Sequence, residues 1–285
     1  MKYENNFCGL PEEYRDYKKS KIVILPAPFD ATSTWIKGAD KGPAAIIEAS
    51  ANMETYDIET DSEIYKQGIF TDKPIKEKKS PEKMVAQLKA RVLRHLKNKK
   101  FVVTLGGEHS ISAATIQAHV ESFKNVSVLQ FDAHADLREE YHGSKFNHAC
   151  VMARAREIAP IVQVGIRSAD IEERASIRKV GNVFLAQDIY DNSNWFSKCL
   201  KKLTKNVYLS IDLDVFDPAI LPSTGTPEPG GLGWYQVLDF LKLLMKKKNV
   251  IGFDIVELCP NLQNKASDFL AAKLIYKLLS YKFEL

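Results

Sequence analysis

Short apolar segments alternate with longer amphipathic segments along most of the chain, and this alternation restricts its fold more than any other feature. The apolar segments are rich in Val and Ile and lack an apolar–polar alternation. Near-continuous apolar strands are typical of a sheet that is covered on both faces. The expected strands are Ile22–Leu25, Phe101–Leu105, Val126–Phe131, Ile161–Val164, Val183–Ala186, Val207–Ile211 and Val250–Asp254, with Gly68–Thr71 as a weaker eighth.

The segments between the expected strands have helical periodicity. Pro81–Asn98 repeats an apolar residue every fourth position, and Ser80 before it is a good N-cap. Trp234–Lys247 and Ser267–Leu279 carry similar apolar stripes. Strands and helices in this alternating order predict an α/β fold in which a parallel sheet carries helices on both faces.

The composition predicts one ordinary globular domain, residues 1–285. Of the 285 residues, 45% are hydrophobic and 27% are charged, and no linker or repeat divides the chain. The net charge of +4 is spread along the chain, so we expect no nucleic-acid partner. The four cysteines are scattered, no signal peptide is recognisable, and no apolar run reaches the roughly 20 residues of a membrane helix. We therefore expect a cytoplasmic protein with no membrane partner.

Polar clusters follow four of the expected strands at the point where each strand ends. They are Gly106–Ser110, Asp132–Asp136, Asp212–Asp214 and the single Glu257. Ligands of open parallel sheets bind beyond the carboxyl ends of the strands. These clusters are therefore the predicted site.

The residue types in these clusters indicate divalent metal ions. Asp132, His134 and Asp136 would share one face if the chain stays extended, and so would Asp212 and Asp214. Four aspartates in one place would repel one another, and two divalent ions would balance their charge. Imidazole with several carboxylates suits a transition metal more than calcium, and the excess of carboxylates favours Mn²⁺. The predicted ligands are His109, Asp132, His134, Asp136, Asp212 and Asp214.

At these residues the sequence resembles the ureohydrolase family, which includes arginases and agmatinases. The resemblance implies a three-layer α/β/α sandwich around a mostly parallel eight-stranded sheet, two Mn²⁺ per chain, and a homo-oligomer, usually a trimer or hexamer. Glu108 departs from the pattern, since many members have Asp there, but this position is not a ligand in the family. The matching segments are Ala27–Asp30, Lys41–Pro43, Gly106–Ser110, Phe131–Asp136, Ser210–Pro218, Gly225–Leu232 and Gly252–Leu258.

The resemblance also assigns the metal ligands. One ion would take His109, Asp132, Asp136 and Asp212, and the other would take Asp132, His134, Asp212 and Asp214. In this arrangement Asp132 and Asp212 bridge the two ions. Asp136 would also accept a proton during the reaction.

Further roles follow from the same resemblance. Glu257 would pair with the guanidinium group of the substrate. His148 matches the family's proton shuttle, and His142 is the competing candidate. Thr226 would shape the pocket. We expect His95, on a lysine-rich helix, to lie at the surface.

The implied reaction is hydrolysis of a guanidino compound. Within the family the sequence resembles bacterial agmatinases in particular, which convert agmatine to putrescine and urea in polyamine biosynthesis. Arginases of the family hold the amino acid head group with small polar residues where this chain has Arg138, and we expect Glu139 and Glu140 beside it to favour a cationic tail. Another ureohydrolase remains an alternative: arginase, guanidinobutyrase or formimidoylglutamase. More distant alternatives are a metal-dependent deacetylase, which usually keeps a single zinc ion, and a non-enzymatic regulator.

Overall fold

A single parallel sheet runs through the centre of the computed structural model, which describes residues 6–190 and 194–285. Its strand order is β2-β1-β3-β8-β7-β4-β5-β6, and every pairing in it is parallel. All the strands expected from the apolar segments form, including the weak one at Gly68–Thr71. They are β1 (Ile22–Ala27), β2 (Ile69–Thr71), β3 (Phe101–Gly106), β4 (Val126–Phe131), β5 (Ile161–Ile166), β6 (Val183–Leu185), β7 (Asn206–Asp212) and β8 (Asn249–Val256).

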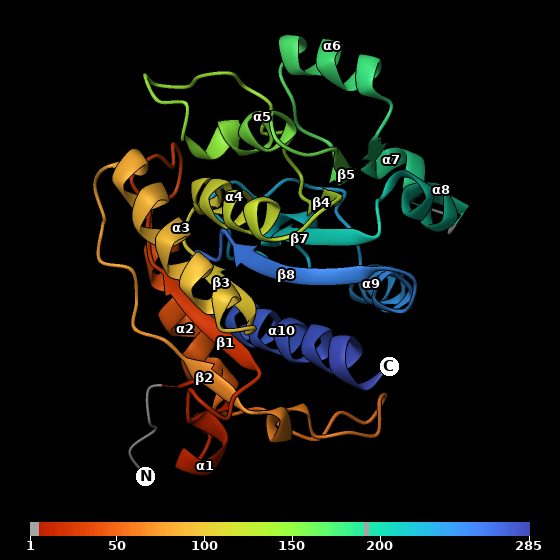
Figure 1. Cartoon of the computed structure of the whole chain (residues 1–285). Helices are drawn as coiled ribbons and strands as arrows, with labels where there is room; N and C mark the ends of the chain where they lie inside the picture. The colour runs from red at the N-terminus through yellow and green to blue at the C-terminus, as the bar shows by residue number, and fades with distance from the viewer. Residues whose placement is uncertain (1–5, 191–193) are drawn as a thin grey trace.

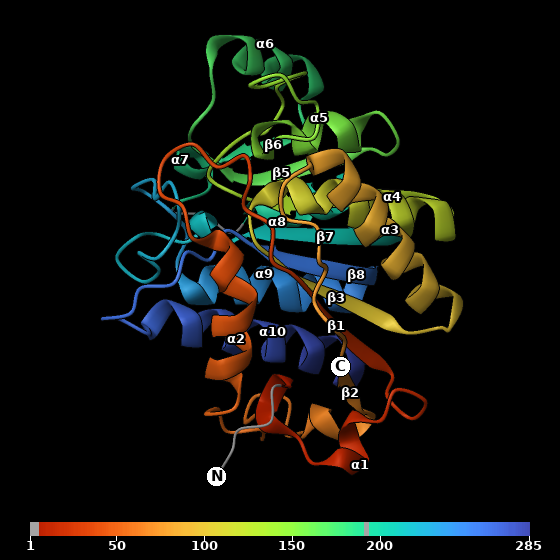
Figure 2. The ribbon, with the colours of Figure 1, turned by 90° about the vertical axis from the view of Figure 1, so that its left-hand side faces the viewer.

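Helices cover both faces of the sheet and complete the three layers (Figure 1). One layer contains α3, α4 and α5, and the other contains α2, α9 and α10, as the turned view in Figure 2 also shows. The helices are α1 (Glu12–Arg15), α2 (Gly42–Ser50), α3 (Pro81–Lys97), α4 (Ser112–Ser122), α5 (Val151–Arg156), α6 (Ile171–Val180), α7 (Ala186–Ile189), α8 (Asn194–Lys202), α9 (Trp234–Lys247) and α10 (Ala266–Glu284).

Each helical layer packs on the sheet through its own apolar core. Phe131 and Phe240 are fully buried in the core on the α9 and α10 side, and Leu88 and Ile116 are fully buried in the core on the α3 and α4 side. Burying one such side chain contributes about 1.5–3 kcal/mol. The sheet is therefore held from both sides, which explains why its strands are apolar without alternation.

The predicted helix boundaries follow local signals. The Ser80 hydroxyl accepts a hydrogen bond from the Lys83 amide at 3.3 Å, so α3 begins with the expected N-cap. The expectation for His95 on this helix is wrong, because its ring is fully buried and its Nε2 lies 2.8 Å from an Asp72 carboxylate oxygen. A lysine-rich helix still has one buried side, and His95 lies on it.

The end of β3 is pressed closely against the segment that follows β1. A Cβ atom on Gly107 would stand 2.1 Å from the Phe29 carbonyl oxygen, so only glycine fits there. The Glu108 amide then donates to that same oxygen at 2.8 Å. This contact brings the segment from Phe29 to Ile36 to the carboxyl edge of the sheet.

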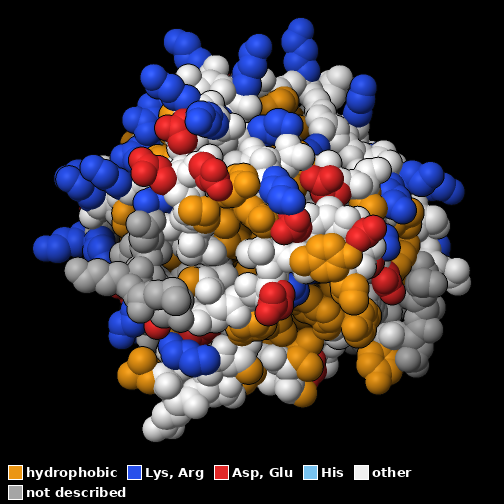
Figure 3. All heavy atoms as spheres, turned by 90° about the horizontal axis from the view of Figure 1, so that it is seen from below, with side chains coloured by type: hydrophobic (Ala, Val, Ile, Leu, Met, Phe, Trp, Pro, Cys, Tyr) orange, Lys and Arg blue, Asp and Glu red, His pale blue; other side chains and the backbone are white. Residues whose placement is uncertain are grey.

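The surface carries mixed charge on the face seen from below in Figure 3. Lysine and arginine side chains lie mainly along the edge of this face, with acidic side chains and hydrophobic patches between them. None of the helices in the described residues is both long and apolar enough to cross a membrane.

Candidate metal centre and substrate pocket

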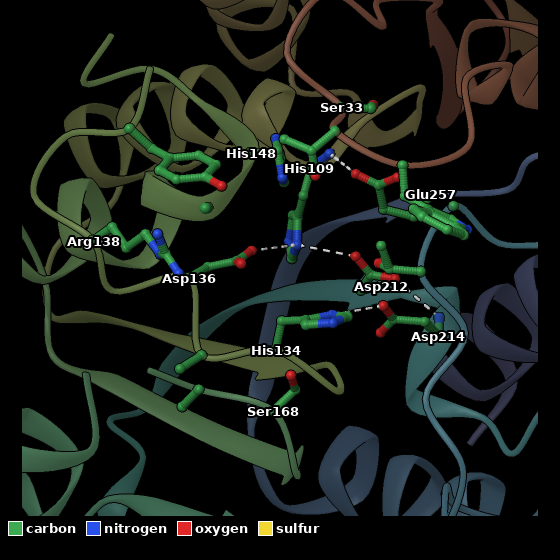
Figure 4. Close-up of a pocket in the computed structure, with 18 of the residues that line it drawn as sticks. Ser33, His109, His134, Asp136, Arg138, His148, Ser168, Asp212, Asp214 and Glu257 are labelled. Carbon is green, nitrogen blue, oxygen red and sulfur yellow. Dashed lines mark hydrogen bonds and ion pairs between the residues drawn. The ribbon is translucent and has the colours of Figure 1, made fainter. Parts of the chain in front are cut away.

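The four polar clusters meet because their strands are neighbours in the middle of the sheet. The central order β3-β8-β7-β4 places the clusters after these strands side by side at one edge. Asp212 is the last residue of β7, Asp132 follows β4, and Glu257 follows β8. The predicted ligands and Glu257 therefore lie close together, and Figure 4 shows the side chains of His109, His134, Asp136, Asp212, Asp214 and Glu257 converging on one space.

His109 lies at the centre of a group of carboxylates. Its Nδ1 lies 2.9 Å from Asp132, 3.1 Å from Asp136 and 3.3 Å from Asp212. Although these oxygens are close, Nδ1 has no hydrogen bond of acceptable geometry to any partner. Three carboxylates thus surround a buried nitrogen without forming a hydrogen bond to it. This arrangement is expected of ligands that share a cation.

The far side of the His109 ring is anchored by a buried polar network. Its Nε2 lies 2.9 Å from the Ser210 hydroxyl, which donates to Asp254 at 2.7 Å. Since the one hydroxyl proton of Ser210 goes to Asp254, the serine oxygen accepts from His109 Nε2. This leaves Nδ1 as the atom available to a metal ion, because a ligating histidine typically donates its other ring N–H to a neighbouring polar group.

A second ligand group adjoins the first and shares Asp132 with it. His134 Nδ1 lies 2.8 Å from Asp214 and 3.7 Å from Asp132. Asp132, His134 and Asp214 place ligand atoms within 4.8 Å of one another, as do His109, Asp132 and Asp212. Asp132 alone belongs to both groups, so this geometry supports it as a bridge more directly than Asp212.

The pKa values of the cluster are shifted because several acidic groups are buried close together. Burial and the neighbouring Asp132 raise the pKa of Asp136 to about 7, and burial with Asp214 raises that of Asp212 well above its usual range. Burial opposes a charge on His134, yet Asp214 and Asp132 raise its pKa to about 12. Without ions, protons must neutralise this cluster; divalent cations would replace them, and the residues present therefore fit a binuclear site.

The path of the chain through Asp132–Asp136 differs from the extended one expected. Strand β4 ends at Phe131, and Asp136 has a positive φ of 52°. Aspartate adopts this left-handed conformation more readily than most residues. The turn brings the Asp136 carboxylate to His109, so the three side chains converge through a turn and not through strand alternation.

A cavity of about 370 Å³ opens over these ligands. Glu257, Thr226 and Arg138 are among the residues that line it. The Oε1 atom of Glu257 accepts from the His109 amide at 2.6 Å, which leaves its second oxygen for a substrate. Burial, and secondly the nearby Glu108, raise the pKa of Glu257 well above its usual range.

Arg138 is already paired in this cavity. Its guanidinium lies 3.3 Å from Asp170 and 4.4 Å from the centre of the Tyr141 ring. Glu139, expected to favour a cationic tail, pairs with Arg154 at 2.7 Å and is not among the residues that line the cavity. The acidic groups of the outer cavity are Asp170 and Glu173, which the sequence reasoning missed.

The two histidine candidates for proton transfer occupy different places. His148 lines the cavity, and burial lowers its pKa to about 4. His142 borders a separate hollow, where its ring lies 4.2 Å from that of Tyr141. The position of His148 in the cavity therefore favours it over His142 as the candidate for proton transfer.

Comparison with known proteins gives consistent matches over nearly the whole chain. The model of the Arginase family matches residues 20–280. An N(1)-aminopropylagmatine ureohydrolase of Synechocystis sp. is 38% identical over 297 residues, which cover 99% of this chain and 97% of that protein. An agmatinase of Pyrococcus horikoshii is 36% identical and the match covers 92% of each chain. The crystal structure of an agmatine ureohydrolase of Thermoplasma volcanium is similar with a TM-score of 0.86 and 31% identity, covering 95% of this chain and 92% of that one.

Proposed function

The chain belongs to the arginase family as an agmatinase-like hydrolase of amidino groups, and from this premise we propose that it is a binuclear manganese enzyme that releases urea from agmatine. The observation that carries the proposal is that Asp132 belongs to two adjoining ligand groups, whose other members, His109, Asp212, His134 and Asp214, line one cavity. Two divalent ions bound there would supply Lewis-acid chemistry and lower the pKa of the attacking water. The proposed ligands are His109, Asp132, His134, Asp136, Asp212 and Asp214.

In the proposed reaction, the residues around the ions orient the substrate and move protons. The free oxygen of Glu257 accepts hydrogen bonds from the guanidinium and fixes its plane. Asp136 takes the proton of the attacking water and passes it on, and His148, as the shuttle, takes up a proton and delivers it to the leaving amine. The carbon–oxygen bond forms, the carbon–nitrogen bond to the tail breaks, and urea and putrescine leave.

The charges in the cavity support a substrate with a cationic tail. Beyond the ligands, the cavity is lined by the carboxylates of Asp170, Glu173 and Glu257 and by Arg138. Because Arg138 is paired with Asp170, a substrate carboxylate would have to break that pair to use it. Agmatine carries no carboxylate, whereas arginine does.

A second candidate substrate is N(1)-aminopropylagmatine. Relatives named for its hydrolysis share 38% identity with this chain. Both candidates present a guanidinium on a cationic chain, and both suit the acidic cavity. The other ureohydrolase alternatives act on substrates that carry a carboxylate. The deacetylase alternative is not supported, because the chain belongs to the arginase family.

The test is urea release with Mn²⁺ from agmatine, N(1)-aminopropylagmatine, arginine and 4-guanidinobutyrate, measured side by side. We expect kcat/KM for agmatine to exceed that for arginine at least about tenfold, or about 1.4 kcal/mol in transition-state binding. Equal or faster turnover of arginine or 4-guanidinobutyrate would refute the proposed substrate. A higher kcat/KM for N(1)-aminopropylagmatine than for agmatine would assign the second candidate.

The biological setting is part of the same proposal. We place the enzyme in the cytoplasm, in putrescine and polyamine biosynthesis, as a single domain that assembles into a trimer or hexamer. Hydrophobic side chains gathered on the face in Figure 3 are of the kind that a subunit interface covers. Sedimentation of the purified protein tests the assembly.

A further inference from the structure

We propose that Glu108 and Thr32 are positioning residues that fix the ring tautomer of His148, with the proton on Nδ1 and the free lone pair on Nε2. The catalytic consequence of this tautomer rests on the proposed function. The tautomer itself does not, because it follows from hydrogen bonds among buried and half-buried groups outside the ligand set.

The starting point is a buried carboxylate surrounded by donors. Glu108 is fully buried, and its Oε2 accepts from the amides of Thr32 at 2.5 Å and Ser33 at 3.1 Å. Its Oε1 accepts from the hydroxyls of Thr32 and Ser110, each at 2.6 Å. These four hydrogen bonds, with the Ser33 hydroxyl 3.5 Å from Oε2, give both oxygens the donors that an ionised carboxylate accepts.

The Thr32 hydroxyl connects Glu108 to His148 through hydrogen bonds. Its single proton is used toward Glu108, so its oxygen can only accept from other partners. That oxygen lies 3.0 Å from the His148 amide and 3.1 Å from His148 Nδ1. The amide is a donor, and the ring nitrogen must donate as well, which places the ring proton on Nδ1.

The state of one ring nitrogen sets the state of the other. In a neutral imidazole with a proton on Nδ1, Nε2 carries the lone pair. His148 lines the same cavity as His109, and Figure 4 shows both side chains. A shuttle needs a nitrogen that can take up and release a proton on the reaction side, and this tautomer leaves Nε2 for that task.

The same carboxylate also holds part of the cavity wall. The segment that Glu108 binds through two amides continues into Trp35 and Ile36, which line the cavity. Removing only the Thr32 hydroxyl leaves both amide contacts in place. The tautomer can therefore be perturbed separately from the wall.

The direct test is the protonation state of His148 in ¹⁵N spectra of histidine-labelled protein loaded with diamagnetic Zn²⁺. The chain has six histidines, and the signals of His148 are identified by their loss in His148→Asn. We expect protonated Nδ1 and unprotonated Nε2 in the wild type and in Thr32→Ser, and a mixture in Thr32→Val. A proton on Nε2 in the wild type, or an unchanged tautomer in Thr32→Val, would overturn the proposal.

Glu108→Gln provides a second, sharper variant. If the amide oxygen keeps the backbone donors, the amide nitrogen must donate to the Thr32 hydroxyl. That hydroxyl then donates to His148 Nδ1, so the tautomer should reverse. His142→Asn is the matched control, since His142 borders a different hollow, and it should leave the His148 signals unchanged.

The kinetic readout separates this proposal from the proposed function. With Mn²⁺ and agmatine, we expect Thr32→Val to lower kcat roughly three- to tenfold, the effect of one neutral hydrogen bond. KM should hardly change, and Thr32→Ser should restore kcat. If no guanidino compound is hydrolysed, the proposed function fails, and the spectra alone then decide whether the tautomer is fixed as proposed.

Discussion

Binding of Mn²⁺ to the metal-free protein should release protons, because the ligand cluster holds them when no ion is present. Nearby carboxylates raise the pKa of His134 to about 12 and that of His109 well above its usual range, although burial acts in the opposite direction. Both imidazoles therefore carry an extra proton at pH 7.5. An ion that takes the Nδ1 lone pair must displace it.

The number of protons can be worked out from the same groups. The two imidazoles release about two protons per chain at pH 7.5. Asp136, with a pKa of about 7, holds about a quarter of a proton at that pH, and the raised pKa of Asp212 acts in the same direction. The expected release is thus at least about two protons when both sites fill.

Titration calorimetry in buffers of different ionisation enthalpy measures this number as the slope of the observed heat against that enthalpy. Because protons leave when the ions bind, apparent Mn²⁺ affinity should fall as the pH is lowered from 8 to 6. His142→Asn should behave as the wild type. A release below about one proton per chain would refute the reasoning, since the imidazoles would then be neutral before the ion arrives.

Two further predictions concern individual side chains. Asp132→Ala should lose more Mn²⁺ than Asp214→Ala, measured by elemental analysis after saturation and gel filtration, because Asp132 belongs to both ligand groups; equal losses would contradict the shared ligand. Glu257→Gln should retain both ions, since a glutamine oxygen can still accept from the His109 amide, but should lower kcat/KM roughly 10- to 100-fold through loss of a charged hydrogen bond to the guanidinium. Unchanged kcat/KM in that variant would remove Glu257 from the site.

Much of the fold could be predicted because the signals are local. Strands buried on both faces need continuous apolar residues, and each such segment became a strand. The periodic stripe and N-cap of α3 likewise placed its start correctly. His95 was misjudged because residue type and neighbouring lysines say little about which side of a helix faces the sheet.

The candidate site could be predicted in its residue types but not in its arrangement. Acidic residues and histidines at the ends of parallel strands predict a site at the carboxyl edge of the sheet, whatever the strand order. The order itself, with β8 and β7 between β3 and β4, brings together segments about 150 residues apart, such as Glu257 and the amide of His109. The turn at Asp136 and the pairing of Glu139 with Arg154 also depend on these tertiary contacts.

The hydrogen bonds that join Glu108, Thr32 and His148 could not be predicted from the sequence, and the reason is physical. Glu108 lies between Gly107, where only glycine fits, and His109, and it is fully buried; a buried carboxylate is costly unless donors surround it. The sequence therefore requires donors near Glu108 without saying which. One donor, the Ser110 hydroxyl, is two positions away, but the others come from Thr32 and Ser33, 76 and 75 positions away, and the close contact of Gly107 with Phe29 brings that segment beside Glu108. A small polar residue such as Thr32 belongs to no apolar pattern that would reveal its position. It reaches Glu108 because Gly107 allows the backbone at Phe29 to approach closely.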